Sequence, residues 1–224
     1  MVDERVIEGR AQARPAEINS VIRNTYMLLS LTLLFSGLTA GVSMAINPPM
    51  ATGLICSLVA IGLLWFVLPR TAESAAGLGV IFLITGMLGF GLGPMLNHYV
   101  TGLANGGQLI MTALGGTGVI FLGLSAYAFT TRKDFSFMGG FLFVGILVAF
   151  LCGIGALIFQ MPGMMLGISA MFILLMSGLI LYQTSAIIHG GETNYIMATI
   201  GLYIALYNMF TSLLHLLAAF AGER

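Results

Sequence analysis

Charged residues divide the chain into four long apolar stretches. Residues 24–69, 74–131, 135–191 and 193–222 contain no Asp, Glu, Lys or Arg. A membrane-spanning helix needs about 20 apolar residues, so each of the first three stretches can hold two helices and the fourth can hold one. Strands of a membrane barrel would instead show short segments of alternating polarity. The pattern therefore predicts an all-α integral membrane protein with seven transmembrane helices.

Turn-forming residues near the middle of the first three stretches separate the two helices of each pair. Proline cannot continue a helix without the loss of a hydrogen bond, and Asn and Gly favour turns. These breaks are Asn47-Pro48-Pro49, the segment from Asn97 to Gly107, and Gln160-Met161-Pro162-Gly163. The predicted helices, which together form one transmembrane domain over residues 24–220, are 24–46, 50–69, 74–96, 107–130, 137–159, 164–188 and 195–220.

The basic residues predict the orientation of the chain, because short cytoplasmic segments of membrane proteins carry an excess of Lys and Arg. With the N-terminus in the cytoplasm, the outside segments hold only Arg224. The inside segments then hold Arg5, Arg10, Arg14, Arg23, Arg70, Arg132 and Lys133. We therefore expect residues 1–23 to form a cytoplasmic tail, disordered up to about Ala16, and residues 221–224 to form a short periplasmic tail.

Composition excludes several classes of protein. Hydrophobic residues make up 58% of the 224 residues and charged residues only 7%, too few to cover the surface of a soluble domain. The net charge is zero, which argues against a nucleic-acid partner and leaves the lipid bilayer as the predicted environment. His98, His189 and His215 lie in different segments, and Cys56 and Cys152 lie within apolar runs. We therefore predict no enzymatic activity, no cofactor and no metal site.

Small residues spaced four apart predict close packing of helices. Such pairs let two helix backbones approach each other in lipid, and we expect them to pack within the bundle rather than to form a homodimer. The pairs are Gly37 and Gly41, Gly89 and Gly93, and Gly163 and Gly167.

The last two predicted helices carry stripes of small or polar residues. The final helix has Gly201, Ala205, Asn208, Thr211, Ser212 and His215 on one side, and the helix before it has Gly178, Tyr182, Ser185 and His189. Gln183 is a single polar residue off the second stripe. Polar stripes in membrane helices face the bundle interior or water. We expect these helices to supply most of the polar interior, either as interhelical hydrogen bonds or as a transport path.

Two predicted cytoplasmic loops carry charge. Glu192 follows His189 closely, so the loop 189–194 is either a pH-sensitive gate or a helix-breaking turn with a polar cap. The second loop contains Arg132, Lys133 and Asp134. Its charges either contact a partner or anchor the topology of the chain.

Several segments resemble one known family. The chain resembles the Bax inhibitor-1 family, and most closely its bacterial YccA branch, over nearly its whole length. The resemblance rests on Arg23-Asn24-Thr25-Tyr26, Gly89-Phe90-Gly91-Leu92-Gly93-Pro94, Ser125-Ala126-Tyr127 and the segments 130–137, 187–196 and 202–208.

This resemblance implies a seven-helix bundle in a bacterial inner membrane, with the last helix at its centre. It also implies modulation of the membrane-anchored AAA protease FtsH, which is associated with the YccA branch. Other family members are pH-sensitive calcium leaks with one carboxylate on each of the last two helices. Gln183 and Ala205 stand at the positions that resemble this pair, so a gate that shares a proton between two acids has no counterpart here. We therefore expect a non-enzymatic regulator of membrane-protein quality control, with a cation leak through the polar stripe as the alternative.

Overall fold

The computed structural model describes residues 15–222, and within them the regular structure is entirely helical. Seven helical segments are long and apolar enough to cross a membrane, which confirms the predicted all-α, seven-span architecture. The second segment consists of α2, η3 and α3 in direct succession. The elements are α1 (Pro15–Ile46), α2 (Ala51–Gly62), η3 (Leu63–Val67), α3 (Leu68–Thr71), α4 (Ala75–Gly102), α5 (Gly106–Thr131), α6 (Met138–Ile158), α7 (Pro162–Ile188) and α8 (Tyr195–Gly222).

Helix α1 begins at Pro15, well before the predicted start at residue 24, so the second part of the predicted tail is helical. Its 32 residues give a length of about 48 Å, whereas a bilayer core is about 30 Å thick. Proline is favoured in the first turn of a helix, and Glu17 places an acid near the positive end of the helix dipole. Disorder is expected up to about Ala16, but Pro15 and Ala16 belong to α1, and residues 221–222 of the predicted periplasmic tail belong to α8. Residues 1–14 and 223–224 lie outside the described residues.

Helix α4 continues to Gly102, beyond the predicted break that begins at Asn97. The side chain of Asn97 does not form a turn in its own segment. Instead, its Nδ2 donates to the carbonyl oxygen of Met44 at 2.8 Å and to Oδ1 of Asn47 at 3.0 Å. Because the last carbonyls of a helix have no partner within it, this asparagine satisfies the C-terminal end of α1 from the neighbouring helix.

A π-helical turn interrupts the second membrane segment at Leu63–Val67. Pro69 lies two residues after this turn, and in a regular α-helix its ring would clash with the carbonyl group four residues earlier, here that of Trp65. The wider π-turn makes room for this ring and keeps the span continuous.

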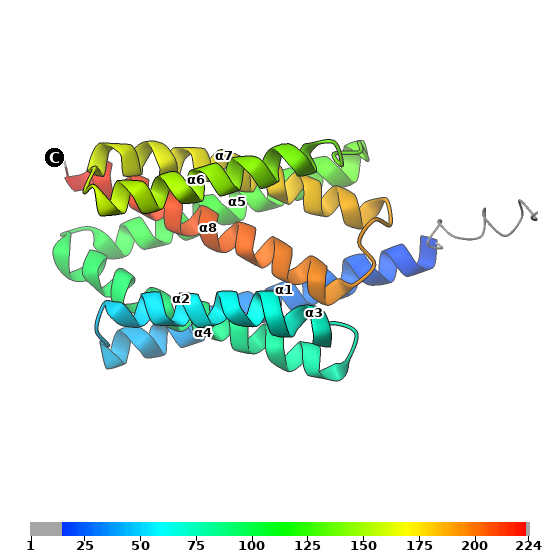
Figure 1. Ribbon diagram of the computed structural model, residues 1–224, viewed down its shortest axis with the longest axis horizontal. Helices are drawn as coiled ribbons and strands as arrows, with labels where there is room; N and C mark the ends of the chain where they lie inside the picture. The colour runs from blue at the N-terminus through cyan, green and yellow to red at the C-terminus, as the bar shows by residue number, and fades with distance from the viewer. Residues whose placement is uncertain (1–14, 223–224) are drawn as a thin grey trace, which may run out of the picture.

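Helix α8 lies between two groups of helices (Figure 1). The group of α1, α2 and α4 lies on one side, the group of α5, α6 and α7 lies on the other, and α8 contacts α1, α4, α5 and α7. Leu202, Tyr203, Ala205, Met209 and Leu214 of α8 are fully buried. The last helix therefore occupies the centre of the bundle.

The glycine pairs pack in different ways. A Cβ atom at Gly89 would lie 2.2 Å from the carbonyl oxygen of Ser36, and one at Gly93 would lie 2.1 Å from Oγ of Ser43, so this pair forms the close contact of α4 with α1. Gly37 and Gly41 have no neighbouring atom within 4 Å of such a Cβ. The same is true of Gly163 and Gly167. The expectation of packing within the bundle is therefore wrong for both of these pairs, because neither makes a close contact with another helix.

Candidate functional site

The interface between α7 and α8 contains the two positions that resemble the carboxylate pair. A Cβ atom at Gly201 would lie 2.5 Å from Nε2 of Gln183, so the amide of Gln183 lies directly over this glycine. Ala205, one turn further along α8, has no exposed surface. Neither side chain can exchange a proton near neutral pH, so these two positions lack the chemistry of a proton-sharing gate.

The polar stripe of α8 bonds mainly to its own helix. Nδ2 of Asn208 donates to the carbonyl oxygen of Ile204 at 2.9 Å, and Oγ1 of Thr211 donates to the carbonyl oxygen of Asn208 at 3.1 Å. His215 reaches another helix, because its Nδ1 lies 2.8 Å from Oγ of Ser169 in α7. Ser212 is buried beside them. Of these three side-chain hydrogen bonds, two therefore stay within α8 and one joins it to α7.

The stripe of α7 faces α6 rather than α8. A Cβ atom at Gly178 would lie 2.8 Å from Cδ2 of Leu142, and one at Gly139 would lie 3.0 Å from the ring of Tyr182. Helical periodicity shows which residues share a face, but not which neighbour that face meets. Ser169 and Gln183 lie on the opposite side of α7, towards α8.

His189 and Ser185 hold the loop between α5 and α6 at one end of the bundle. Ser185 Oγ accepts a hydrogen bond from the backbone N–H of Phe135 at 3.0 Å and donates to the carbonyl oxygen of Lys133 at 3.2 Å. The His189 ring lies between two carbonyl oxygens, with Nε2 3.1 Å from that of Arg132 and Nδ1 2.9 Å from that of Ser185. A neutral imidazole has one N–H and an imidazolium has two, so protonation allows both bonds at once.

The acidic residues near this loop have partners of their own. The hydroxyl and the backbone N–H of Ser136 both donate to Oδ1 of Asp134, and these hydrogen bonds hold the pKa of Asp134 below its ordinary value. Asp134 therefore stays ionised through the neutral range. Glu192 Oε1 accepts the backbone N–H of Asn194 at 2.8 Å, which makes this acid part of the turn between α7 and α8. A pocket of about 220 Å³ lies between this turn and the start of α1, with Glu17 and Glu192 among its lining residues.

Asn194 fixes the start of α8. Its Oδ1 accepts the backbone N–H groups of Ile196 at 2.9 Å and Met197 at 3.2 Å, which is the geometry of a helix N-cap. Its Nδ2 donates to the carbonyl oxygen of Ala72 at 3.0 Å, at the end of the second membrane segment. One side chain therefore caps the central helix and ties it to the group that contains α2.

Replacing Asn194 by alanine is expected to lower the free energy of unfolding by about 2 kcal/mol, because it removes the cap and an interhelical hydrogen bond together. The measurement is thermal unfolding of the purified protein in detergent. Asn194→Asp is the matched control, since it keeps the cap acceptor and loses only the donor to Ala72. Equal melting temperatures for wild type and Asn194→Ala would contradict this role.

Tyrosine hydroxyls within the bundle were not predicted as site residues. The hydroxyl of Tyr203 lies 2.6 Å from Oγ of Ser36 and donates to the carbonyl oxygen of Thr85 at 3.2 Å, so it joins α8 to α1 and α4. The hydroxyl of Tyr26 donates to Oγ of Ser125 in α5 at 3.1 Å. Tyrosine is enriched at membrane interfaces, so a tyrosine within an apolar helix is a sequence signal that could have identified Tyr203. Tyr26 stands at the start of its apolar stretch and gives no such signal.

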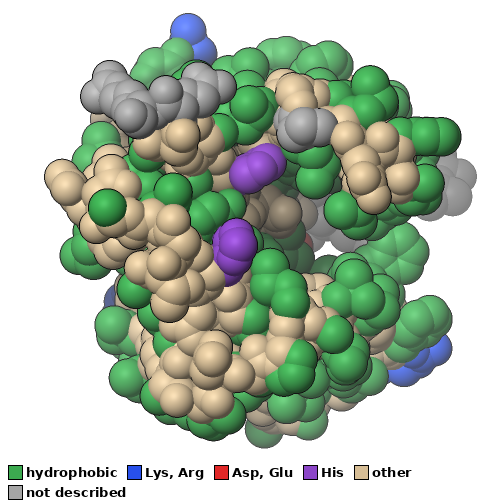
Figure 2. Space-filling view, turned by 90° about the vertical axis from the view of Figure 1, so that its left-hand side faces the viewer, with side chains coloured by type: hydrophobic (Ala, Val, Ile, Leu, Met, Phe, Trp, Pro, Cys, Tyr) green, Lys and Arg blue, Asp and Glu red, His purple; other side chains and the backbone are tan. Residues whose placement is uncertain are grey.

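The far end of the bundle, where α4 ends and α5 begins, has a hollow at its centre (Figure 2). Two histidine side chains border it, and hydrophobic and uncharged side chains make up most of this face. Over residues 15–222, no group of three His, Cys, Asp or Glu side chains could hold a metal ion. The described features define a multi-pass helical membrane protein in which a few polar groups, such as Tyr203, Asn97 and Asn194, join one helix to another.

Comparison with known sequences gives the family. Residues 18–222 match the sequence profile described as "Inhibitor of apoptosis-promoting Bax1". The chain belongs to the Bax inhibitor-1 family, as the sequence resemblance predicted.

Relatives from two bacteria are similar over most or all of the chain. A protein of Pseudomonas aeruginosa without an assigned function is 48% identical over 223 residues, which cover 100% of both chains. The Escherichia coli K12 protein named "Modulator of FtsH protease YccA" is 50% identical over 199 residues, or 89% of this chain and 90% of the relative. A protein of Escherichia coli O6:H1 with the same identity and coverage is named "Inner membrane protein YccA". The chain is thus a multi-pass protein of the bacterial inner membrane.

Proposed function

We propose that this protein is a non-enzymatic regulator of membrane-protein quality control that modulates the membrane protease FtsH. The observation that carries the proposal is the 50% identity, over 89% of the chain, to a protein named as a modulator of that protease. The long apolar stretches that form the membrane spans contain no Asp or Glu. This composition is consistent with a regulator rather than a carboxylate-gated leak.

The orientation proposed for the chain places its N-terminus in the cytoplasm and its C-terminus in the periplasm. Arg23, Arg70, Arg132 and Lys133 lie towards the same end of the bundle, where α1 begins and where the α5–α6 and α7–α8 loops lie (Figure 1). An excess of Lys and Arg favours the cytoplasmic side.

The contact proposed for the protease is the α5–α6 loop. Arg132, Lys133 and Asp134 are all exposed. Their backbone is held in place by the bonds from His189 and Ser185, so the charged side chains project from a fixed support. A rigid, charged loop can recognise a partner at a smaller entropic cost than a mobile one.

Removal of the protein from cells is expected to change the half-life of a misassembled membrane protein that FtsH degrades, measured by pulse-chase labelling. Tagged wild-type protein should co-purify with FtsH from detergent-solubilised membranes. The double variant Arg132→Gln, Lys133→Gln should weaken both effects, because it removes two charges from the loop and leaves the backbone carbonyls in place.

Gln108→Ala is the matched control, since Gln108 is an exposed polar residue near the start of α5, at the opposite end of the bundle. If both variants behave as wild type, the loop is not the contact. If wild type neither co-purifies with FtsH nor alters turnover, the proposed function is wrong.

The alternative function, a pH-sensitive calcium or other cation leak, predicts flux through the polar stripe of α8. We expect no calcium efflux above that of protein-free liposomes at either pH 6 or pH 8, because Gln183 and Ala205 offer neither charge nor a shared proton. Efflux from wild-type protein that falls in Asn208→Leu or His215→Leu would favour the leak. The double variant Gln183→Asp, Ala205→Asp tests whether the scaffold can conduct once carboxylates are present, with Gln183→Asn, Ala205→Ser as its uncharged control.

A further inference from the structure

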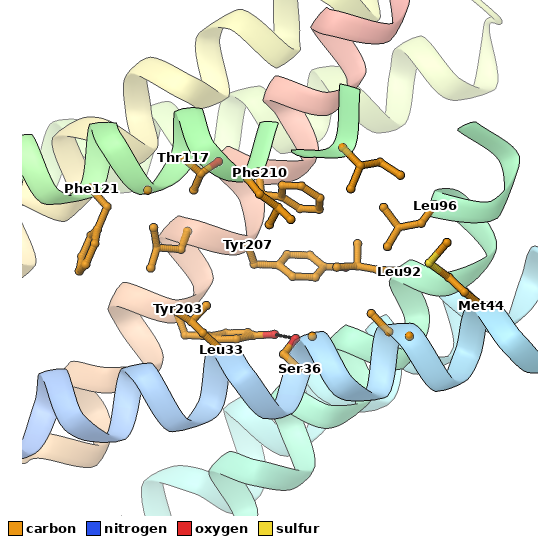
Figure 3. A pocket seen from close by; sticks show the side chains of 17 residues that line it. Leu33, Ser36, Met44, Leu92, Leu96, Thr117, Phe121, Tyr203, Tyr207 and Phe210 are labelled. Atoms are coloured by element: carbon orange, nitrogen blue, oxygen red, sulfur yellow. Dashed lines mark hydrogen bonds between the residues drawn. The ribbon is translucent and has the colours of Figure 1, made fainter. Parts of the chain in front are cut away.

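A cleft of about 410 Å³ lies between α1 and α5, and it is distinct from the polar contacts of the α7–α8 interface (Figure 3). Helices α4 and α8 contribute its inner wall. Pockets that hold small molecules in proteins have volumes of about 300–1,000 Å³. The cleft is therefore large enough to bind a ligand.

The rim of the cleft faces the membrane. Leu33 on α1 is 37% exposed and Leu114 on α5 is 49% exposed, although both line the cleft. Gly37, Gly41 and Gly118 complete the rim, and a Cβ atom added at any of them would meet nothing within 4 Å. Both flanking helices are membrane spans, so the surroundings of this opening are lipid.

The inner wall is apolar. Much of it is formed by Leu92 and Leu96 of α4 and by Leu206 and Phe210 of α8. No charged residue lines the cleft. Two of the hydroxyls at the wall, those of Ser36 and Tyr203, bond to each other at 2.6 Å. The hydroxyl of Thr117 donates to the carbonyl oxygen of Ala113 at 2.7 Å. These three hydroxyls already have partners, and Tyr207 adds the one other hydroxyl among the lining residues. The lining is therefore mostly apolar and favours a hydrocarbon over a polar ligand.

The cleft is elongated along α1. Its lining runs from Leu33 to Met44, which corresponds to about 16 Å at 1.5 Å per residue. An empty apolar space of this size would forfeit dispersion contacts along its walls, and apolar cavities do not hold water well. A flexible hydrocarbon chain from the surrounding bilayer fits both its length and its chemistry.

We propose that this cleft binds one acyl chain of a membrane phospholipid. The chain enters between α1 and α5 and packs against α4 and α8, and its headgroup stays outside the cleft. This proposal is independent of the one concerning the protease, because it rests only on the shape and lining of the bundle.

The test is photo-cross-linking in reconstituted vesicles. The full-length protein is placed in phosphatidylethanolamine and phosphatidylglycerol vesicles that contain a trace of phospholipid with a diazirine near the end of one acyl chain. After illumination, mass spectrometry locates the attached lipid. We expect attachment to the inner-wall residues Leu92, Leu206 and Phe210, in addition to lipid-facing residues such as Leu174. Attachment to the outer residues alone would overturn the proposal.

Variants that fill the cleft make the test specific. The double variant Gly37→Leu, Gly118→Leu should reduce inner-wall attachment several-fold and leave attachment to Leu174 unchanged, because both leucines project into the opening. The control Gly62→Leu, Gly155→Leu adds the same bulk at two glycines that are equally free of neighbours and lie away from the cleft. Unchanged inner-wall attachment in the filled variant would overturn the proposal. So would an unlabelled inner wall together with a dimeric mass for the detergent-solubilised protein, which would identify a second copy as the occupant.

Discussion

Substitution of Gly89 by leucine is expected to destabilise the bundle by about 3 kcal/mol, at the upper end of the usual cost of overpacking. The Cβ atom alone would lie 2.2 Å from the carbonyl oxygen of Ser36 and 2.5 Å from Oγ1 of Thr39. The nearer of these atoms is backbone, so no side-chain rotation can relieve the clash. Helices α1 and α4 must separate, which breaks the close contact that also includes Gly93 and Ser43.

The measurement is the thermal unfolding midpoint of the purified protein in detergent, together with the yield of folded protein. Gly89→Ala provides a smaller perturbation in case the leucine variant does not fold. Gly62→Leu is the control, because a Cβ atom there would meet no atom within 4 Å. Identical midpoints for Gly89→Leu and Gly62→Leu would show that α1 and α4 do not pack as closely as described.

Replacement of Tyr203 by alanine is expected to cost about 3–5 kcal/mol, the range found when large aromatic side chains are removed from a core. Tyr203 is only 1% exposed and lies where α8 meets α1 and α4. The truncation leaves a cavity and also removes the hydrogen-bond partner of Ser36.

Tyr203→Phe separates the two contributions. It keeps the ring and removes only the hydroxyl, so the expected cost is about 1–3 kcal/mol for the group left without its partner. Unfolding in increasing denaturant, followed by circular dichroism, gives the three stabilities. If Tyr203→Phe is as damaging as Tyr203→Ala, the hydroxyl rather than the ring accounts for the stabilisation. If both variants match wild type, Tyr203 does not stabilise the contact of α8 with α1 and α4.

The seven spans could be predicted from the sequence because charged groups are costly in hydrocarbon and so mark the ends of membrane segments. The start of α1 could not, because a helix is not confined to the bilayer and Pro15 begins one that extends beyond it. The end of α4 also lies beyond the predicted end, because Asn97 bonds to a neighbouring helix rather than forming a turn. Hydropathy locates the membrane, but tertiary contacts decide where a helix ends.

The candidate site could be predicted only in part. Periodicity correctly grouped Gly178, Tyr182 and Ser185 on one face, but it carries no information on whether that face meets α6 or α8. The same limit applies to Gly37 and Gly41, whose spacing is equally suited to a close contact within the chain and to an open rim. The tie made by Tyr203 links residues far apart in the sequence, so only the assembled bundle reveals it.

The central position of α8 has a consequence for how the protein is made. This helix is synthesised after the other six spans, yet it contacts members of both helix groups, so the bundle cannot close until α8 has been made. Until then, the faces of α1, α4, α5 and α7 that will receive α8 have only lipid to cover them. A chain that stops before Tyr195 retains six membrane spans and lacks the segment that joins them. Such a product is an incompletely assembled membrane protein, so each round of synthesis passes through a state of the kind that quality-control proteases degrade.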